Sequence, residues 1–127
     1  MFYVVESSKS FQEVVFDLEP VVQRLGFVVL HRHDLAEILY RREIGIDEEC
    51  MVFDIANYRH LERLLACGLR LSALLPWRIS VFTENGVTRL ALLRPETLLA
   101  PPGSDPVLAR LAAEMEEKMV QIVDEAR

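Results

Sequence analysis

A segment bracketed by Pro76 and Pro95 constrains the fold of this chain more than any other, because its local signals predict a β-hairpin. Residues 77–81 alternate apolar and polar side chains, and residues 87–92 form a second strand-like run. The Asn-Gly dipeptide at 85–86 between them favours a two-residue type I′ turn. Proline cannot donate a ladder hydrogen bond, so each proline marks the limit of a strand. The chain therefore contains at least one pair of antiparallel strands.

Counting outward from this turn sets the partners across the hairpin. The predicted pairs are Val81 with Leu90, Ile79 with Leu92, Phe82 with Arg89 and Ser80 with Ala91. The first two pairs are apolar and are expected to face the core. The opposite face mixes apolar and charged side chains, which makes it a candidate dimer surface or the floor of a ligand pocket. Its interface candidates are Arg78, Phe82 and Arg89.

Periodicity and capping signals predict the remaining elements. Further strands are predicted at residues 2–5, 27–31 and 51–55. Helices are predicted to follow the capping residues Ser10, Asp34, Asn57 and Asp105, of which the first two match the capping box. Gly26 and Gly68 end the first and third helices, and the second is short and ends around Arg42. Pro20 predicts a kink near residues 16–19 of the first helix, or its division into two.

This order of elements predicts a single α+β domain over residues 1–127. Strand, helix, strand, short helix, strand, helix, hairpin and helix follow one another, and each helix has one apolar stripe to bury. An antiparallel sheet of about five strands with helices on one face is the economical arrangement. The other face of that sheet, or one of its edges, is then expected to be covered by something else.

The composition narrows the classes of partner. No apolar run approaches the roughly twenty residues needed to cross a bilayer, and no targeting signal opens the chain, so we expect a soluble, cytoplasmic protein. A net charge of −6 at pH 7 repels phosphate backbones and anionic headgroups, which argues against nucleic acid and membrane partners. Cys50 and Cys67 form no CxxC pair and are expected to be free packing residues.

Five residues are candidates for ligand binding, namely His31, His33, Asp54, Asn57 and Trp77. The two histidines stand two apart on a predicted strand, so their imidazoles point to one face and make a weak metal-site candidate that lacks a third ligand. The carboxylate within an apolar strand indicates either a functional group or an outward position beside Arg78 or Arg89. Asn57 is interpreted as a helix cap or a pocket wall, and Trp77 as a packing residue.

Several short motifs resemble, in order, the domain of unknown function 302 family. They are Gly26-Phe27, Asp34-Leu35, Ala56-Asn57, Leu74-Leu75-Pro76 and Pro95, and the likeness runs from about Phe11 to about Leu98. The resemblance implies an antiparallel α+β domain of TATA-binding-protein-like layout and a homodimer, and it implies no reaction. The chain departs from the family where it has Ala56-Asn57-Tyr58 for Cys-Asn-Pro and Leu75-Pro76-Trp77 for Leu-Pro-Cys. Thiol or metal chemistry at those two points is therefore not implied here.

Two functions remain open at this point. The first is a homodimeric, non-enzymatic binding or interaction module, favoured by the mixed outer face of the hairpin. The alternative is a small-molecule or metal-binding, or catalytic, domain with a pocket near the strand end that carries His31 and His33 and near the helix start at Asn57. No Ser-His-Asp set is supported and no glycine-rich phosphate loop occurs, so the sequence specifies no catalytic residue and no cofactor.

Overall fold

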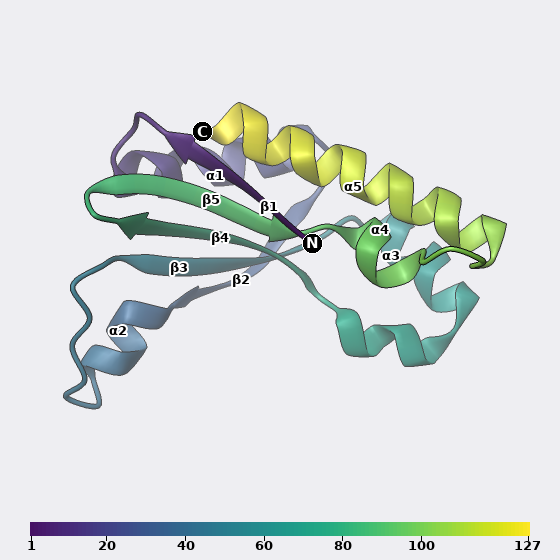
Figure 1. Ribbon diagram of the computed structural model, residues 1–127, viewed down its shortest axis with the longest axis horizontal. Helices are drawn as coiled ribbons and strands as arrows, with labels where there is room; N and C mark the ends of the chain where they lie inside the picture. Colours follow the sequence, from purple (N-terminus) through teal and green to yellow (C-terminus); the bar gives the residue numbers. More distant parts are fainter.

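The computed structural model describes residues 1–127 and contains one five-stranded antiparallel sheet with helices packed on one of its faces (Figure 1). The strands lie in the order β1-β5-β4-β3-β2. The elements are β1 Phe2–Ser7, α1 Phe11–Arg24, β2 Val28–Asp34, α2 Leu35–Tyr40, β3 Cys50–Ala56, α3 Tyr58–Cys67, η1 Leu69–Leu74, β4 Trp77–Glu84, β5 Val87–Leu93, α4 Pro95–Leu99 and α5 Pro106–Ala126. The predicted α+β class and sheet of five strands are confirmed.

The β4–β5 hairpin forms with the predicted turn and register. Asn85 and Gly86 have φ of 52° and 82°, the left-handed conformation at both turn positions that a type I′ turn requires. All four predicted cross-strand pairs occur. Strand β1 pairs with the outer side of β5, and β3 pairs with the other side of β4, so the hairpin is the centre of the sheet. The sequence did not predict the short helices η1 and α4, the second of which begins at Pro95.

Helix α1 is one continuous helix even though Pro20 lies inside it. Its capping box is complete, because Ser10 Oγ accepts from the Glu13 N–H at 3.1 Å and Glu13 Oε1 accepts from the Ser10 N–H at 3.2 Å. Pro20 deprives the Phe16 carbonyl of its usual donor, and Phe16 is 80% exposed, so water can reach that turn. The alternative of two separate helices is therefore wrong.

The hydrophobic core lies between α1, α5 and one face of the sheet. Helix α1 contributes three fully buried side chains, Val14, Leu18 and Val22, at helical spacing. Helix α5 is the largest helical contributor, with Leu111, Ala112, Met115, Met119, Ile122, Val123 and Ala126. The central strands add Phe53, Ile55, Ile79, Val81, Leu90 and Leu92. Apolar side chains thus recur every two residues along the strands and about every 3.6 residues along the helices, and they meet in one core.

The side chains that alternate with these core residues form the opposite face of the sheet, which we call the open face because α1 and α5 leave it uncovered. It includes Phe2, Val4, Glu6, His31, His33, Cys50, Val52, Asp54, Arg78, Ser80, Phe82, Glu84, Val87, Arg89, Ala91 and Leu93. Phe2 is 66% exposed and Val4 is 48% exposed. No helix has the length and apolar character needed to cross a membrane.

Candidate functional site

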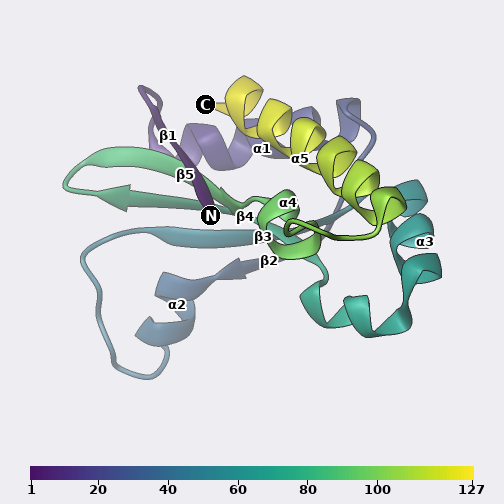
Figure 2. The same ribbon diagram turned by 45° about the vertical axis from the view of Figure 1, so that its right-hand side comes forward.

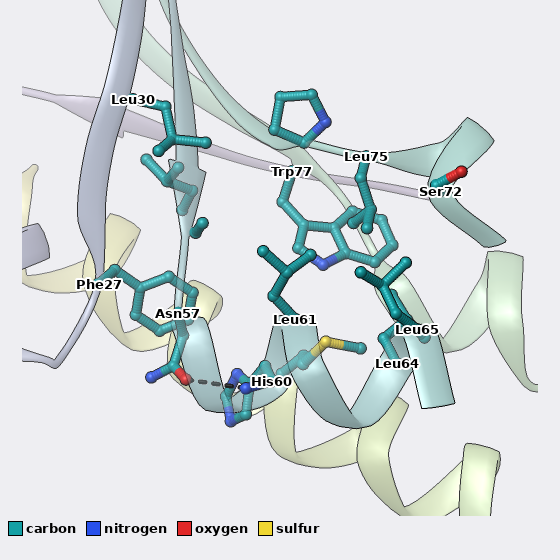
Figure 3. A pocket seen from close by; sticks show the side chains of 14 residues that line it. Phe27, Leu30, Asn57, His60, Leu61, Leu64, Leu65, Ser72, Leu75 and Trp77 are labelled. Atoms are coloured by element: carbon teal, nitrogen blue, oxygen red, sulfur yellow. Dashed lines mark hydrogen bonds between the residues drawn. The ribbon is translucent and has the colours of Figure 1, made fainter. Parts of the chain in front are cut away.

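An apolar pocket of about 290 Å³ lies at one end of the sheet, between α3, η1 and the ends of the neighbouring strands. Figure 2 shows α3 and η1 beyond the strand ends and away from α2. Fourteen residues line the pocket: Phe27, Leu30, Ile55, Ala56, Asn57, His60, Leu61, Leu64, Leu65, Ser72, Leu75, Pro76, Trp77 and Met115 (Figure 3). Ten of them are hydrophobic, and none is Lys, Arg, Asp or Glu.

Asn57 fixes one wall of the pocket where β3 ends and α3 begins. Its Oδ1 accepts from the His60 N–H at 3.0 Å, which caps α3, and its Nδ2 donates to the Gly26 carbonyl at 3.1 Å. Gly26 has φ of +87°, and a Cβ there would lie 3.5 Å from Asn57 Nδ2. Both ends of the Asn57 amide are therefore engaged, so this residue is a helix cap as well as a pocket wall.

His60 is the one titratable side chain of the lining. Its ring packs edge-on against Phe27 with centroids 5.7 Å apart, and its Nδ1 is buried without a hydrogen-bond partner. Burial lowers the pKa of His60 from its ordinary value of 6.5, although Glu114 nearby acts in the opposite direction. The imidazole is therefore neutral at pH 7, and the pocket carries no net charge.

A separate polar cluster lies on the open face around Asp54. Asp54 is 9% exposed, its Oδ2 lies 2.7 Å from His33 Nε2, and its Oδ1 lies 3.5 Å from Arg78 Nε. The rings of His31 and His33 have centroids 4.5 Å apart, so both side chains do share one face, as predicted. No group of three or more His, Cys, Asp or Glu side chains is placed to hold a metal ion.

A bulge in β2 brings this cluster together. The register between β2 and β3 shifts between Val29 and His31, so His31 pairs with Asp54, whereas unshifted pairing would put Leu30 there. Because side chains alternate along a strand, the shift turns both histidines to the open face. Arg32, on the other side, stacks over Phe53 and pairs with Glu19 of α1. The predicted position of Asp54 beside Arg78 is confirmed, and its contact with His33 was not predicted.

The five predicted ligand-binding residues do not form one site. Asn57 and Trp77 line the pocket, whereas His31, His33 and Asp54 lie in the cluster on the open face. The pleat of the sheet separates the two groups, because Ile55 and Trp77 point to the core side while Asp54 points away from it. The apolar pocket is therefore lined by Asn57 and Trp77 but not by His31, His33 or Asp54, and ligand binding by any of the five stays a prediction.

Sequence reasoning missed most of the pocket wall. His60 lies three residues after the Asn57 cap and has no motif around it. Leu61, Leu64 and Leu65 form an apolar stripe, a pattern that predicts core packing and not a cavity wall. The stripe lines a cavity because the short helix η1, which follows α3 after Gly68, supplies Ser72 to the facing wall. Cys50 and Cys67 are both free, as their spacing predicted, but Cys67 is exposed and is therefore not the packing residue that was expected.

The fold and this pocket together define a small α+β domain with one antiparallel sheet and a single-sided helical layer. A family model described as domain of unknown function DUF302 matches residues 3–126, so the chain belongs to that family. A crystal structure of an uncharacterised conserved DUF302 protein from Bacillus stearothermophilus is similar, with a TM-score of 0.91 and 26% sequence identity. The match covers 99% of this chain and 98% of that one. No curated protein matches the chain.

Proposed function

We propose that this protein is a binding module that takes up a small, apolar molecule in the pocket between α3, η1 and the strand ends. The observation that carries the proposal is a cavity of about 290 Å³ whose lining has ten hydrophobic residues and no ionised side chain. Ligand pockets are concave and mostly apolar, and they span roughly 300–1,000 Å³, so this one fits a ligand of fragment size. Small hydrocarbons bind in apolar cavities of proteins, so an apolar molecule is the natural probe.

The lining has few reactive side chains, so binding is favoured over catalysis. His60 is its one titratable side chain, and no hydrogen bond joins it to the Ser72 hydroxyl, the one nucleophile of the wall (Figure 3). Acid–base and nucleophilic mechanisms need a base within hydrogen-bond reach of the group that it activates. The expected cytoplasmic location stays a prediction.

A titration of the full chain with ethylbenzene, followed by calorimetry, tests the proposal. We expect saturable binding at one site per chain and loss of that binding in Leu61→Glu, because the new carboxylate puts a charge into an apolar pocket. Leu69→Glu is the matched control, since Leu69 is 76% exposed and does not line the pocket. Equal binding by both variants, or no binding by the parent, contradicts the proposal.

A second candidate function is self-association through the open face, and the exposure of Phe2 and Val4 on that face favours it. Five strands about 4.8 Å apart and roughly 22 Å long give about 500 Å² per copy, so a pair of copies buries about 1,000 Å², the lower bound for a specific interface. The face carries charges of both signs, Arg78 and Arg89 with Glu6 and Glu84, so a second copy offers opposite charges.

Sedimentation velocity at micromolar concentration tests this homodimer. We expect a dimer for the parent and a monomer for Val4→Lys, which places an ammonium in the middle of the apolar part of the open face. Phe16→Lys is the control, because Phe16 is also exposed but lies on α1, on the other side of the sheet. A monomeric parent at that concentration contradicts self-association and leaves the ligand proposal intact.

A further inference from the structure

The indole N–H of Trp77 is a hydrogen-bond donor in the pocket wall, and no other wall residue accepts a hydrogen bond from it. Trp77 is 6% exposed and is the first residue of β4. The one hydrogen bond between lining residues that involves a side chain joins Asn57 and His60, so the Trp77 indole N–H has no acceptor among them (Figure 3). Buried tryptophan N–H groups usually have a partner, because leaving one unpaired costs free energy.

The indole nitrogen faces the cavity and is not sealed within the core. Figure 3 shows the nitrogen-bearing edge of the Trp77 ring turned to the side of the pocket on which Leu61 lies. The side-chain atoms that are both sealed from solvent and unpartnered are Asp54 Oδ1, His60 Nδ1 and Arg89 Nε, and Trp77 Nε1 is not one of them. A molecule in the cavity can therefore reach this donor.

The other polar side chains of the wall are either engaged within the protein or point away from the cavity. Asn57 uses both ends of its amide within the protein, and His60 Nδ1 is sealed. The Ser72 hydroxyl points away from the other lining side chains (Figure 3). Trp77 Nε1–H is thus the donor available to a ligand, and it is a neutral donor, which suits a neutral acceptor such as a carbonyl oxygen.

The same wall disfavours a charged ligand. A carboxylate or an ammonium entering the pocket loses its hydration and meets no side chain of opposite charge. Building on the proposed binding function, we infer that the pocket selects uncharged molecules with an apolar body and one carbonyl-type oxygen, which accepts a hydrogen bond from the Trp77 indole N–H. The ligand class is therefore that of small ketones, aldehydes and esters rather than free acids or amines.

Acetophenone and ethylbenzene are matched probes, since they differ in the carbonyl oxygen and have nearly the same size. Trp77 is the one tryptophan of the chain, so its indole N–H gives a single, isolated NMR signal. We expect acetophenone to move this proton signal downfield, because its carbonyl oxygen accepts a hydrogen bond from the indole N–H. Ethylbenzene has no acceptor and should cause no downfield shift. In calorimetry, Trp77→Phe weakens acetophenone binding by about threefold to tenfold and leaves ethylbenzene binding within twofold.

Two further measurements complete the test. Benzoate and phenethylammonium are expected not to bind, and binding of either as tight as that of acetophenone overturns the uncharged class. Tyr58→Phe is the control for loss of a polar group, because Tyr58 is 64% exposed, begins α3 and does not line the pocket. It should leave both affinities unchanged.

The outcomes separate this inference from the function on which it rests. If neither acetophenone nor ethylbenzene binds the parent, the pocket function fails and the inference fails with it. If both bind, the indole signal stays in place and Trp77→Phe weakens both equally, the inference fails and the binding function stands. If Trp77→Phe does not fold, the indole signal of the parent protein decides.

Discussion

At the scale of single residues, His33 and His31 provide a test of the cluster on the open face. His33 Nε2 lies 2.7 Å from the buried Asp54 Oδ2, whereas His31 packs edge-on against the His33 ring and makes no ion pair with a carboxylate. We expect His33→Ala to lower the free energy of unfolding by about 1–2 kcal/mol, because it leaves the carboxylate short of a partner. His31→Ala should cost less than about 0.5 kcal/mol.

Urea unfolding at pH 7.5 measures both variants. The cost of His33→Ala should largely disappear when Asp54 has already been replaced by Ala, since the two residues then have no shared interaction. Equal costs for the two histidine variants contradict the assigned pair.

His60 gives the protein a pH dependence of known sign. Burial holds the pKa of the folded His60 below its value of 6.5 in the unfolded chain, so the unfolded state binds the proton more tightly. Its contribution to stability is complete above about pH 6.5 and is lost as the pH falls from there towards the lowered pKa. Unfolding in urea at pH 7.5, 6.5 and 5.5 should therefore show a smaller loss of stability in His60→Gln than in the parent. Identical losses in the two proteins, with His31→Gln as control, contradict this.

At the scale of elements, Pro20 and Pro106 form a matched pair. Pro20 lies inside α1, where it lacks the N–H that should bond to the Phe16 carbonyl, whereas Pro106 begins α5, where its N–H would have no helical partner. We expect Pro20→Ala to raise the free energy of unfolding by about 1–3 kcal/mol, since it restores a helical hydrogen bond. Pro106→Ala should change it by less than about 0.5 kcal/mol. Thermal or urea unfolding measures the difference, and no gain for Pro20→Ala contradicts the assigned cost.

Elements differ in how far their sequences predict them. The capping box at Ser10 and the caps at Asp34, Asn57 and Asp105 all form, because each depends on hydrogen bonds within a few residues. The short helices η1 and α4 were not predicted, because they have only 6 and 5 residues and neither has a side-chain cap. The bulge in β2 likewise has no local signal, since it depends on pairing with β3.

At the scale of the whole molecule, α5 closes the fold. It packs on α1 and the sheet, and Tyr3 Oη donates to Asp124 Oδ1 at 2.6 Å, so the two ends of the chain are joined. Met119 is fully buried in this layer, and we expect Met119→Ala to lower the free energy of unfolding by about 2–5 kcal/mol. Val107→Ala, at a position 59% exposed on the same helix, should cost less than about 0.5 kcal/mol. Similar costs, measured by urea unfolding, contradict the central position of α5 in the core.

By itself, the sequence determined the hairpin with its register, the α+β class, the four main helix starts and the faces that become core. These features depend on interactions between residues close along the chain or across one turn, and period and capping express them directly. The Asn85-Gly86 turn, for example, sets the pairing of Val81 with Leu90, so this cross-strand contact depends only on residues near the turn.

Only the tertiary structure decided where the candidate sites lie. The Asp54 cluster needs the bulge that turns His31 and His33 to the open face. The pocket needs residues of α3, η1 and α5 to meet around one space. A cavity is the space that several packed elements leave between them, so no single stretch of sequence encodes it. For that reason Trp77, which the sequence indicates only as a packing residue beside a proline, takes its place in the pocket wall only in the folded chain.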